Sequence, residues 1–335
     1  MAEKIDVLSI GDVVIDNFVK LIDDNAEIIP RGDEKLLAME YGTKIPYDFN
    51  TLIAGVGNSG NAAVAFARLG LKSGLISNVG NDDYGRDIIE ALEANKVLAH
   101  LIKINRAKKS NYHFVLWYKE ERTILIKHEE YDYKWPHLTA DDKPSWVYFS
   151  SIGHNSLDYH HEVIEWLDRE DNKDIKLAFQ PGTFQLEFGP EKLAKIYARS
   201  NVLLVNREEA VKISNGNYHD FNDLFNKLHA LGPKIVVITD GPAGAYASDG
   251  TKRLKMPVYP DIAPPYERTG AGDAFASTFV AALAMGEDME GALMWAPINS
   301  MNVVQKVGGQ EGLLSKNELL EYLKKAPDWY KPSNI

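Results

Sequence analysis

Hydrophobic and polar positions alternate in blocks along the second half of the chain. Short runs rich in Val, Ile and Leu predict buried strands at 146–149, 175–179, 202–205 and 235–239. The stretches between them have helical periodicity, at 159–169, 190–199, 208–213 and 221–231. Strands that alternate with helices in this way are typical of a parallel sheet covered on both faces. We therefore expect an α/β fold, a three-layer α/β/α sandwich with a mostly parallel central sheet.

The N-terminal part of the chain adds segments that do not follow this alternation. A buried strand is expected at 5–11, a second extended segment at 13–22, and a hairpin at 111–118 and 122–127. Residues 23–50 are polar and irregular, which indicates a loop or an edge-strand excursion. The extended segment and the hairpin predict a small sheet that stands apart from the main layer as a lid. We expect a single domain over residues 1–335, with the lid formed by segments inserted at about 13–51 and 106–128.

Two glycine-rich turns lead into helices of small residues. The first, at 54–61, precedes a helix that ends at Gly70, and the second, Gly270-Ala271-Gly272, precedes a helix from Asp273 to Met285. Backbone N–H groups in such a turn can surround an anion at the positive end of the helix dipole. A carboxylate at Asp273 would repel a phosphate that is merely bound, but it suits a base for a hydroxyl that receives a phosphoryl group. The alternative is a tight turn with Asp273 as the helix cap.

Other polar residues give weaker indications of a functional site. Asp12 and Asp16 follow the first strand, where open α/β sheets bind ligands, although a turn former and a solvated strand residue would give the same pattern. The histidines, His128 and His154 among them, have no zinc-ligand spacing, so we interpret them as surface or core residues.

Composition and charge exclude several classes of function. The 335 residues carry a formal charge of −11, which disfavours general binding to nucleic acid. The chain has no cysteine, which excludes disulfides and thiolate sites. No apolar run reaches the roughly 18 residues of a membrane span, and the N-terminus lacks a signal-peptide pattern, so we expect a cytoplasmic protein without membrane partners.

Four motifs in order give the chain a family resemblance. They are Gly-x-Gly-x-x-x-Asn at 55–61, Asn-x-x-Glu at 206–209, Thr-x-Gly-x-x-Gly at 239–244 and Gly-Ala-Gly-Asp at 270–273. In this order and in these strand and helix contexts, the chain resembles the PfkB or ribokinase-like family of sugar and nucleoside kinases. The likeness covers nearly the whole chain, from Gly11 to about Gly309. It implies an enzyme that moves the γ-phosphoryl group of Mg-ATP to a hydroxyl of a small sugar or sugar acid.

The resemblance also implies roles for individual residues. Asp273 matches the catalytic base, and Gly270, Ala271 and Gly272 match the anion hole for the γ-phosphoryl group. The positions that match substrate-binding residues are Asp16, Gly57 and Asn61. Those that match the nucleotide site are Thr239, Gly241 and Gly244, together with Asn302 on a late helix.

Asn206 and Glu209 match a pair that works near Mg²⁺, through water. A single carboxylate suits a hydrated Mg²⁺ ion. The same two residues would also make a good helix cap.

Three positions depart from the family pattern. Glu267 and Arg268 stand where Asp-Thr is common, and that Asp helps to form a monovalent-cation site in some members, so the resemblance leaves K⁺ dependence open for this chain. Arg268 instead offers a fixed positive charge near the phosphates. Val56 replaces one glycine of a pair in the substrate loop, which narrows the space beside the substrate.

Several alternatives stay open at this stage. A nucleoside kinase of the same fold is the nearest, and aromatic residues on the lid, Tyr112, Phe114, Trp117 and Tyr118, leave it open. A catalytically silent ligand-binding relative is another. A dinucleotide-dependent dehydrogenase is disfavoured because no Gly-x-Gly-x-x-Gly follows the first strand. The resemblance also allows a homodimer that pairs through the lid.

Overall fold

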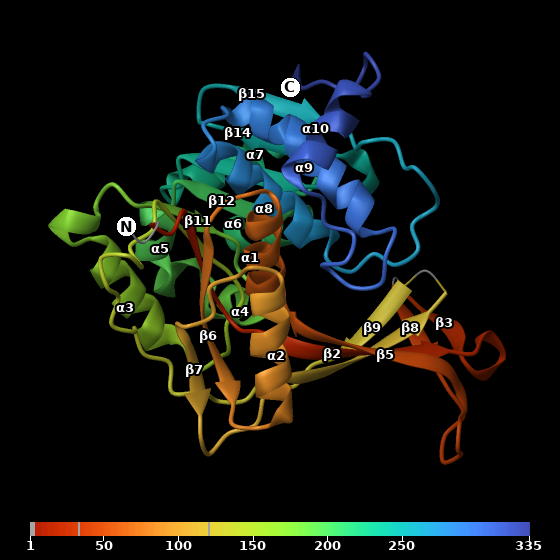
Figure 1. The fold of residues 1–335 in the computed structure, drawn as a ribbon. Helices are drawn as coiled ribbons and strands as arrows, with labels where there is room; N and C mark the ends of the chain where they lie inside the picture. Colours follow the sequence, from red (N-terminus) through yellow and green to blue (C-terminus); the bar gives the residue numbers. More distant parts are fainter. Residues whose placement is uncertain (1–3, 33, 120) are drawn as a thin grey trace.

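The protein forms a twisted central sheet between two layers of helices, with a smaller sheet that projects from one side (Figure 1). The computed structural model describes residues 4–32, 34–119 and 121–335. Within these residues the main sheet has the order β16-β15-β14-β13-β12-β11-β10-β1-β6-β7. Its strands are β1 (Val7–Ile10), β6 (Ser73–Gly80), β7 (Ile102–Asn105), β10 (Trp146–Phe149), β11 (Lys176–Phe179), β12 (Val202–Asn206), β13 (Ile235–Thr239), β14 (Ala245–Ser248), β15 (Arg253–Met256) and β16 (Ser333–Asn334). All pairs from β7 to β13 are parallel, whereas β14, β15 and β16 pair antiparallel.

Successive residues of each central strand enter different cores, because side chains alternate across a sheet. Val7 packs on one face and Leu8 on the other, and Val237 and Val236 divide in the same way. The strands are buried on both faces, which explains why they are continuous apolar runs and do not alternate with polar residues.

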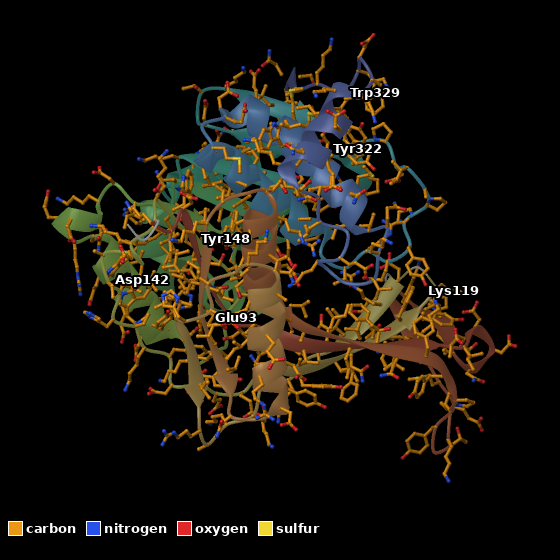
Figure 2. All side chains as sticks on the ribbon, viewed as in Figure 1. Glu93, Lys119, Asp142, Tyr148, Tyr322 and Trp329 are labelled. Carbon is orange, nitrogen blue, oxygen red and sulfur yellow. The ribbon has the colours of Figure 1, made fainter. Side chains whose placement is uncertain are left out.

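The helices cover the two faces. One layer contains α1 (Asn58–Arg68), α2 (Asp83–Ala94), α8 (Ala271–Ala284), α9 (Met289–Val303) and α10 (Lys316–Lys324). The other contains α3 (Leu157–Leu167), α4 (Thr183–Lys192), α5 (Ala194–Arg199), α6 (Arg207–Ser214) and α7 (Phe221–Ala230). Figure 2 shows how side chains fill the space between these layers around Tyr148, which is fully buried. None of the described helices is long and apolar enough to span a membrane.

The projecting sheet is the expected lid. It has the order β5-β2-β8-β9, from β2 (Val14–Leu21), β5 (Tyr47–Val56), β8 (Tyr112–Tyr118) and β9 (Glu121–Leu125). Strands β2 and β8 run parallel, and the other two pairings are antiparallel. A separate hairpin of β3 (Glu27–Arg31) and β4 (Glu34–Ala38) lies beside it. Lys119, which Figure 2 labels, lies in the turn between β8 and β9.

The structure confirms the predicted fold class and corrects some elements. The stretch at 23–50 follows the second of its two expected forms, because it contains the start of β5, an edge strand of the lid, and it adds the β3–β4 hairpin, which was not predicted. The segment expected as one helix at 190–199 contains the end of α4 and all of α5, and α4 itself kinks at Gly189, which has a non-helical φ of 82° and precedes Pro190. The antiparallel end of the main sheet, β14 to β16, was not predicted, because those strands are short or partly polar.

Candidate functional site

Three cavities meet at the N-terminus of α8. The lid cavity, of about 380 Å³, lies between the lid and α8 and includes Asp16, Asn61 and Asp273 in its wall. The α9 cavity, of about 300 Å³, lies between the turn after β13 and helices α8 and α9. The β12 cavity, of about 160 Å³, lies at the end of β12 and includes Asn206 and Glu209. Gly272 lines all three, so the first turn of α8 is the point at which their contents would meet.

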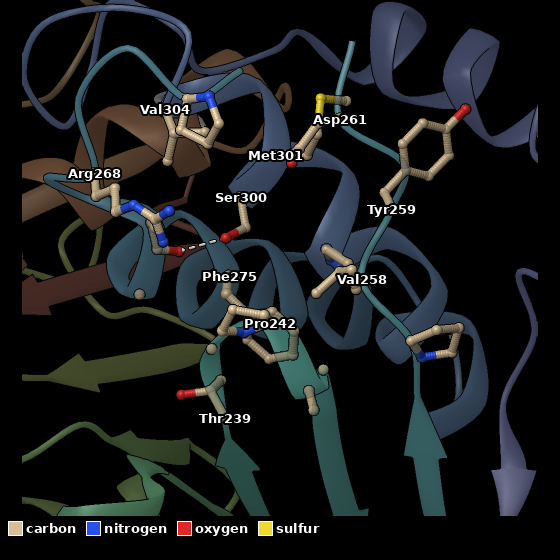
Figure 3. Close-up of a pocket in the computed structure, with 18 residues that line it drawn as sticks. Thr239, Pro242, Val258, Tyr259, Asp261, Arg268, Phe275, Ser300, Met301 and Val304 are labelled. Carbon is tan, nitrogen blue, oxygen red and sulfur yellow. Dashed lines mark hydrogen bonds between the residues drawn. The ribbon is translucent and has the colours of Figure 1, made fainter. Parts of the chain in front are cut away.

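The turn before α8 depends on a glycine. Gly270 has a φ of 81°, and a Cβ atom there would lie 2.3 Å from Cα of Gly309. Only glycine therefore fits without moving the backbone. From this turn α8 begins at Ala271, and the carbonyl of Ala271 accepts a hydrogen bond of 2.9 Å from the hydroxyl of Ser300 on α9 (Figure 3). The first N–H groups of a helix have no partner within it, so Gly270, Ala271 and Gly272 offer donors to an anion.

Asp273 lies one residue beyond these donors. Its carboxylate accepts hydrogen bonds from the side-chain amides of Asn58 and Asn61, both at 2.8 Å, and of Gln180 at 3.3 Å. Burial raises the pKa of Asp273, and the three amides and the nearby Arg122 oppose that shift. The result is an oriented carboxylate whose pKa is above its ordinary value. It can accept a proton from a group in the lid cavity.

The predicted substrate residues come together on the opposite wall. Asp16 is on β2, Gly57 precedes α1 and Asn61 is in the first turn of α1, and all three line the lid cavity with Asp273. Gly57 has a φ of 93°, and a Cβ atom there would lie 3.1 Å from the carbonyl oxygen of Asp12. A side chain in this place would be strained and would crowd the end of β1.

His113 and His128 also line this cavity, so the interpretation as a surface or core residue does not hold for His128, whereas it holds for the buried His160. Nδ1 of His128 lies 3.2 Å from a carboxylate oxygen of Asp12, and Nδ1 of His113 lies 3.3 Å from Asp16. The carboxylate of Asp12 also accepts from the hydroxyl of Tyr133 and from the N–H of Gly153. Asp12 is thus a buried anchor for the cavity wall and not a simple turn former. The pairing of β2 with β8 places Asp16 directly beside His113, a neighbour that sequence spacing did not reveal.

The predicted nucleotide residues divide between two places. Thr239, Gly241 and Gly244 line the α9 cavity. In Gly244, with a φ of 98°, a Cβ atom would lie 2.2 Å from the carbonyl oxygen of Met256. Asn302 does not line this cavity: its amide donates to the carbonyl of Gly312 at 2.8 Å, on another side of α9.

The face of α9 that meets the cavity follows helical spacing. It presents Pro297, Ser300 and Met301, followed by Val304 just beyond the helix. These positions lie at intervals of three and four, whereas Asn302 is about 100° away from Met301 around the helix axis. Figure 3 shows Ser300, Met301 and Val304 on one side of the cavity, with Pro242 and Phe275 across from them.

Asn206 and Glu209 form the helix cap that the sequence allowed. The side chain of Asn206 accepts from the N–H of Glu209, and the carboxylate of Glu209 accepts from the N–H of Asn206, both at 2.8 Å. Both residues nevertheless line the β12 cavity with Gln180 and Gly272. Burial is the main reason why the pKa of Glu209 is raised, and the charge of Asp273 adds to it. A cation bound in this cavity would relieve that repulsion.

Two of the three residues that depart from the family pattern, Glu267 and Arg268, pair with the lid. The carboxylate of Glu267 is buried, accepts from the N–H and hydroxyl of Thr269 at 2.8 and 2.6 Å, and lies 3.6 Å from Nε of Arg122 on β9. Nε of Arg268 lies 3.8 Å from the neighbouring lid residue Glu121. Two ion pairs therefore join the tip of the lid to the loop before α8, one with its cation on the lid and the other with its cation on the loop.

Sequence reasoning missed several residues of the site. Asn58 and Gln180 hold Asp273 but belong to different elements, α1 and the end of β11, and no local motif joins them. Phe184 on α4 and His113 on β8 also line the lid cavity, and no local motif joins these two residues either. A polar residue directly after each parallel strand was the available signal, because such residues gather at one edge of the sheet. Gln180, like Asn206, follows that rule.

The chain is similar to known proteins over most of its length. A family model described as "pfkB family carbohydrate kinase" matches residues 45–316. The ribokinase of Bacillus subtilis (strain 168) is 29% identical over 308 residues, which cover 89% of this chain and 96% of that protein. A cytidine kinase of Thermococcus kodakarensis is 26% identical over 263 residues, covering 75% of this chain and 88% of that protein.

Solved structures share the fold. The structure of Arabidopsis thaliana ribokinase complexed with ribose and ATP has a TM-score of 0.75, and the match covers 96% of this chain and 99% of that one. The sequence identity is 19%, so this likeness supports the architecture alone.

Proposed function

The chain belongs to the pfkB family of carbohydrate kinases, which are ATP-dependent phosphotransferases, and we propose that Asp273 is the base for transfer to a hydroxyl of a small sugar. The acceptor occupies the lid cavity, between Asp16 and Asn61 on one side and Asp273 on the other. Asp273 takes the proton of the acceptor hydroxyl as its oxygen attacks the γ-phosphorus. The bond from that phosphorus to the β–γ bridging oxygen breaks, and ADP leaves.

The position of Asp273 carries the proposal. Its carboxylate is fixed by three amide donors and lies one residue from the backbone N–H groups at the start of α8. A base and an anion site are thus side by side where the cavities meet. An arrangement of this kind places the acceptor oxygen and the phosphoryl group within reach of each other.

ATP fits the α9 cavity. Apolar side chains of Val258, Met301 and Val304 line it and suit a flat base, while Ala271 and Gly272 line both this cavity and the lid cavity. The triphosphate would then extend towards α8, where the helix dipole and the N–H groups favour negative charge.

Asn206 and Glu209 fit a hydrated Mg²⁺ ion in the β12 cavity. Mg²⁺ prefers few protein ligands and keeps several waters, and a buried carboxylate with a raised pKa gains from a nearby cation. The ion would neutralise charge on the phosphates of ATP. For K⁺ the residues do not fit, because the Glu267 carboxylate already faces hydrogen-bond donors and the guanidinium of Arg122.

A nucleoside is the second candidate acceptor, and one observation favours it. Phe184, Ile124 and Ile126 line the lid cavity, and the two isoleucines are 38% and 53% exposed. A nucleobase would cover these apolar surfaces while its ribose reached Asp16. The lid aromatics considered from the sequence do not contribute, because none of Tyr112, Phe114, Trp117 and Tyr118 is among the described residues that line this cavity.

An ADP-release assay with Mg-ATP tests the proposal. Ribose, fructose, 2-keto-3-deoxygluconate, adenosine and cytidine would be compared as acceptors. With the best acceptor, Asp273→Asn should lower kcat by at least about 10²-fold and leave the acceptor KM within a few-fold. Asp83→Asn, at an exposed position on α2, is the matched control and should behave as wild type. Unchanged turnover in Asp273→Asn would refute the assignment of the base, and activity with nucleosides alone would select the second candidate.

A further inference from the structure

Two of the three cavities share a single charged side chain. The residues that line both the lid cavity and the α9 cavity are Arg268, Ala271 and Gly272. Ala271 and Gly272 offer backbone N–H groups, so Arg268 is the one shared residue with a cationic side chain. Figure 3 shows it entering the α9 cavity from the loop before α8. Under the proposed function, the γ-phosphoryl group passes from ATP to the acceptor at this junction of the two cavities.

The charge balance around ATP makes this position informative. Among the described residues that line the α9 cavity, Arg268 is the only Lys or Arg, and none lines the β12 cavity. The lid cavity adds Arg122, but three aspartates line it as well. A triphosphate carries about four negative charges, and charge moves onto the γ-phosphoryl oxygens as transfer proceeds. Arg268 is thus the cationic side chain best placed to meet that charge.

The two arginines that line the lid cavity, Arg122 and Arg268, differ in how buried their ion pairs are. Arg122 lies 3.6 Å from the buried carboxylate of Glu267, and its side chain is 26% exposed. Arg268 is 47% exposed, and its partner Glu121, at 3.8 Å, is 72% exposed. An ion pair at this distance between exposed groups contributes little to stability, so Arg268 can leave it at small cost. Arg122 thus faces a buried carboxylate, whereas Arg268 pairs with an exposed one and can turn towards a ligand at a smaller cost.

We propose that Arg268 is a catalytic residue that leaves its exposed partner Glu121 and binds the transferring phosphoryl group. This inference rests on the proposed function. Planar guanidinium groups bind phosphate oxygens through two parallel hydrogen bonds, which suits the flat arrangement of the three oxygens in phosphoryl transfer. The proton of the acceptor still goes to Asp273, and Arg268 neither gains nor loses one. Its contribution is electrostatic and is largest when charge has moved onto the phosphoryl oxygens.

Steady-state kinetics of Arg268→Ala and Arg268→Lys test the proposal. We expect Arg268→Ala to lower kcat by about 10²-fold, with the KM for the acceptor unchanged, because the side chain acts on the transition state. Arg268→Lys keeps the charge but loses the two-point contact, so it should retain part of the activity. Added guanidinium ion should restore part of the kcat of Arg268→Ala but not of Arg268→Lys. If Arg268 were purely structural, neither the selective loss of kcat nor the restoration by guanidinium ion would be observed.

Two further variants separate the ion pair from the chemistry. Glu121→Gln removes the partner of Arg268 and should change kcat by less than about threefold, and Arg86→Gln, an exposed arginine on α2 that also pairs with one carboxylate, should have no effect. Thermal unfolding of each variant should match wild type. The proposal is overturned if Arg268→Ala keeps kcat within threefold of wild type, or if Glu121→Gln reproduces its loss. Absence of ADP release by wild type with every acceptor would instead reject the proposed function, and this inference with it.

Discussion

Replacing Gly272 by alanine should separate stability from activity at the start of α8. Gly272 is the residue common to all three cavities, and it is the second residue of the helix. A Cβ atom built on it meets no atom within 4 Å, and its φ is not in the left-handed region. The protein itself therefore accommodates the methyl group. The same methyl group would occupy the space in which the γ-phosphoryl group lies on the proposed function.

The expected magnitudes have opposite signs. Alanine is favoured over glycine in a helix by up to about 1 kcal/mol, and less in the first turn, so the free energy of unfolding should stay the same or rise slightly. Displacing the phosphoryl group from the anion hole should cost about as much as the loss of one donor. That corresponds to a fall of about 10²- to 10³-fold in kcat.

Urea denaturation and the ADP-release assay measure the two quantities on the same preparation. Gly270→Ala is the informative comparison, because its Cβ atom would lie 2.3 Å from Cα of Gly309 and its φ of 81° strains any other residue. That variant should lose stability as well as activity. If Gly272→Ala keeps the full kcat of wild type, the anion hole is not at the start of α8 and the reasoning fails.

Three further predictions concern charge. Burial raises the pKa of Asp273, and the base must be ionised to accept a proton, so kcat should fall on the acid side at a pH above the ordinary pKa of aspartate. A pH–rate profile measures this fall, with circular dichroism to exclude unfolding. The prediction is wrong if kcat does not fall on the acid side, or falls only at or below the ordinary pKa of aspartate. Glu267→Gln should lower the free energy of unfolding in urea by about 2–4 kcal/mol, because it leaves Arg122 without its buried partner. The control, Glu321→Gln on the surface of α10, should be as stable as wild type. Equal stability of both variants and wild type would contradict the assigned ion pair. Exchanging K⁺ for Na⁺ or tetramethylammonium should leave kcat within about twofold, since a guanidinium already faces Glu267, and strong activation by K⁺ would show otherwise.

The site shows where local sequence is sufficient and where it is not. The turn at 270–273 was predictable because glycine, small residues and an aspartate before an apolar helix are a local signal with a physical cause. Asn302 was misplaced because a helix was expected without its rotation, and one residue turns a side chain by about 100°. The partners of Asp273 come from α1 and β11, more than 90 residues away, and only the packed sheet brings them to it.

The alternation of strands and helices from β10 to β13, the lid hairpin and the main motifs were determined by the sequence alone, because periodicity and turn residues act over a few positions. Tertiary structure decided which side chains share a cavity. The parallel pairing of β2 with β8 sets His113 beside Asp16, and the approach of the lid to the loop before α8 gives Glu267 and Arg268 their partners. Such contacts depend on the register and orientation of elements far apart in the chain. For that reason the turn that carries Asp273 was visible in the sequence, which also indicated a positive charge near the phosphates at Arg268, whereas the place of Arg268 at the junction of two cavities required the fold.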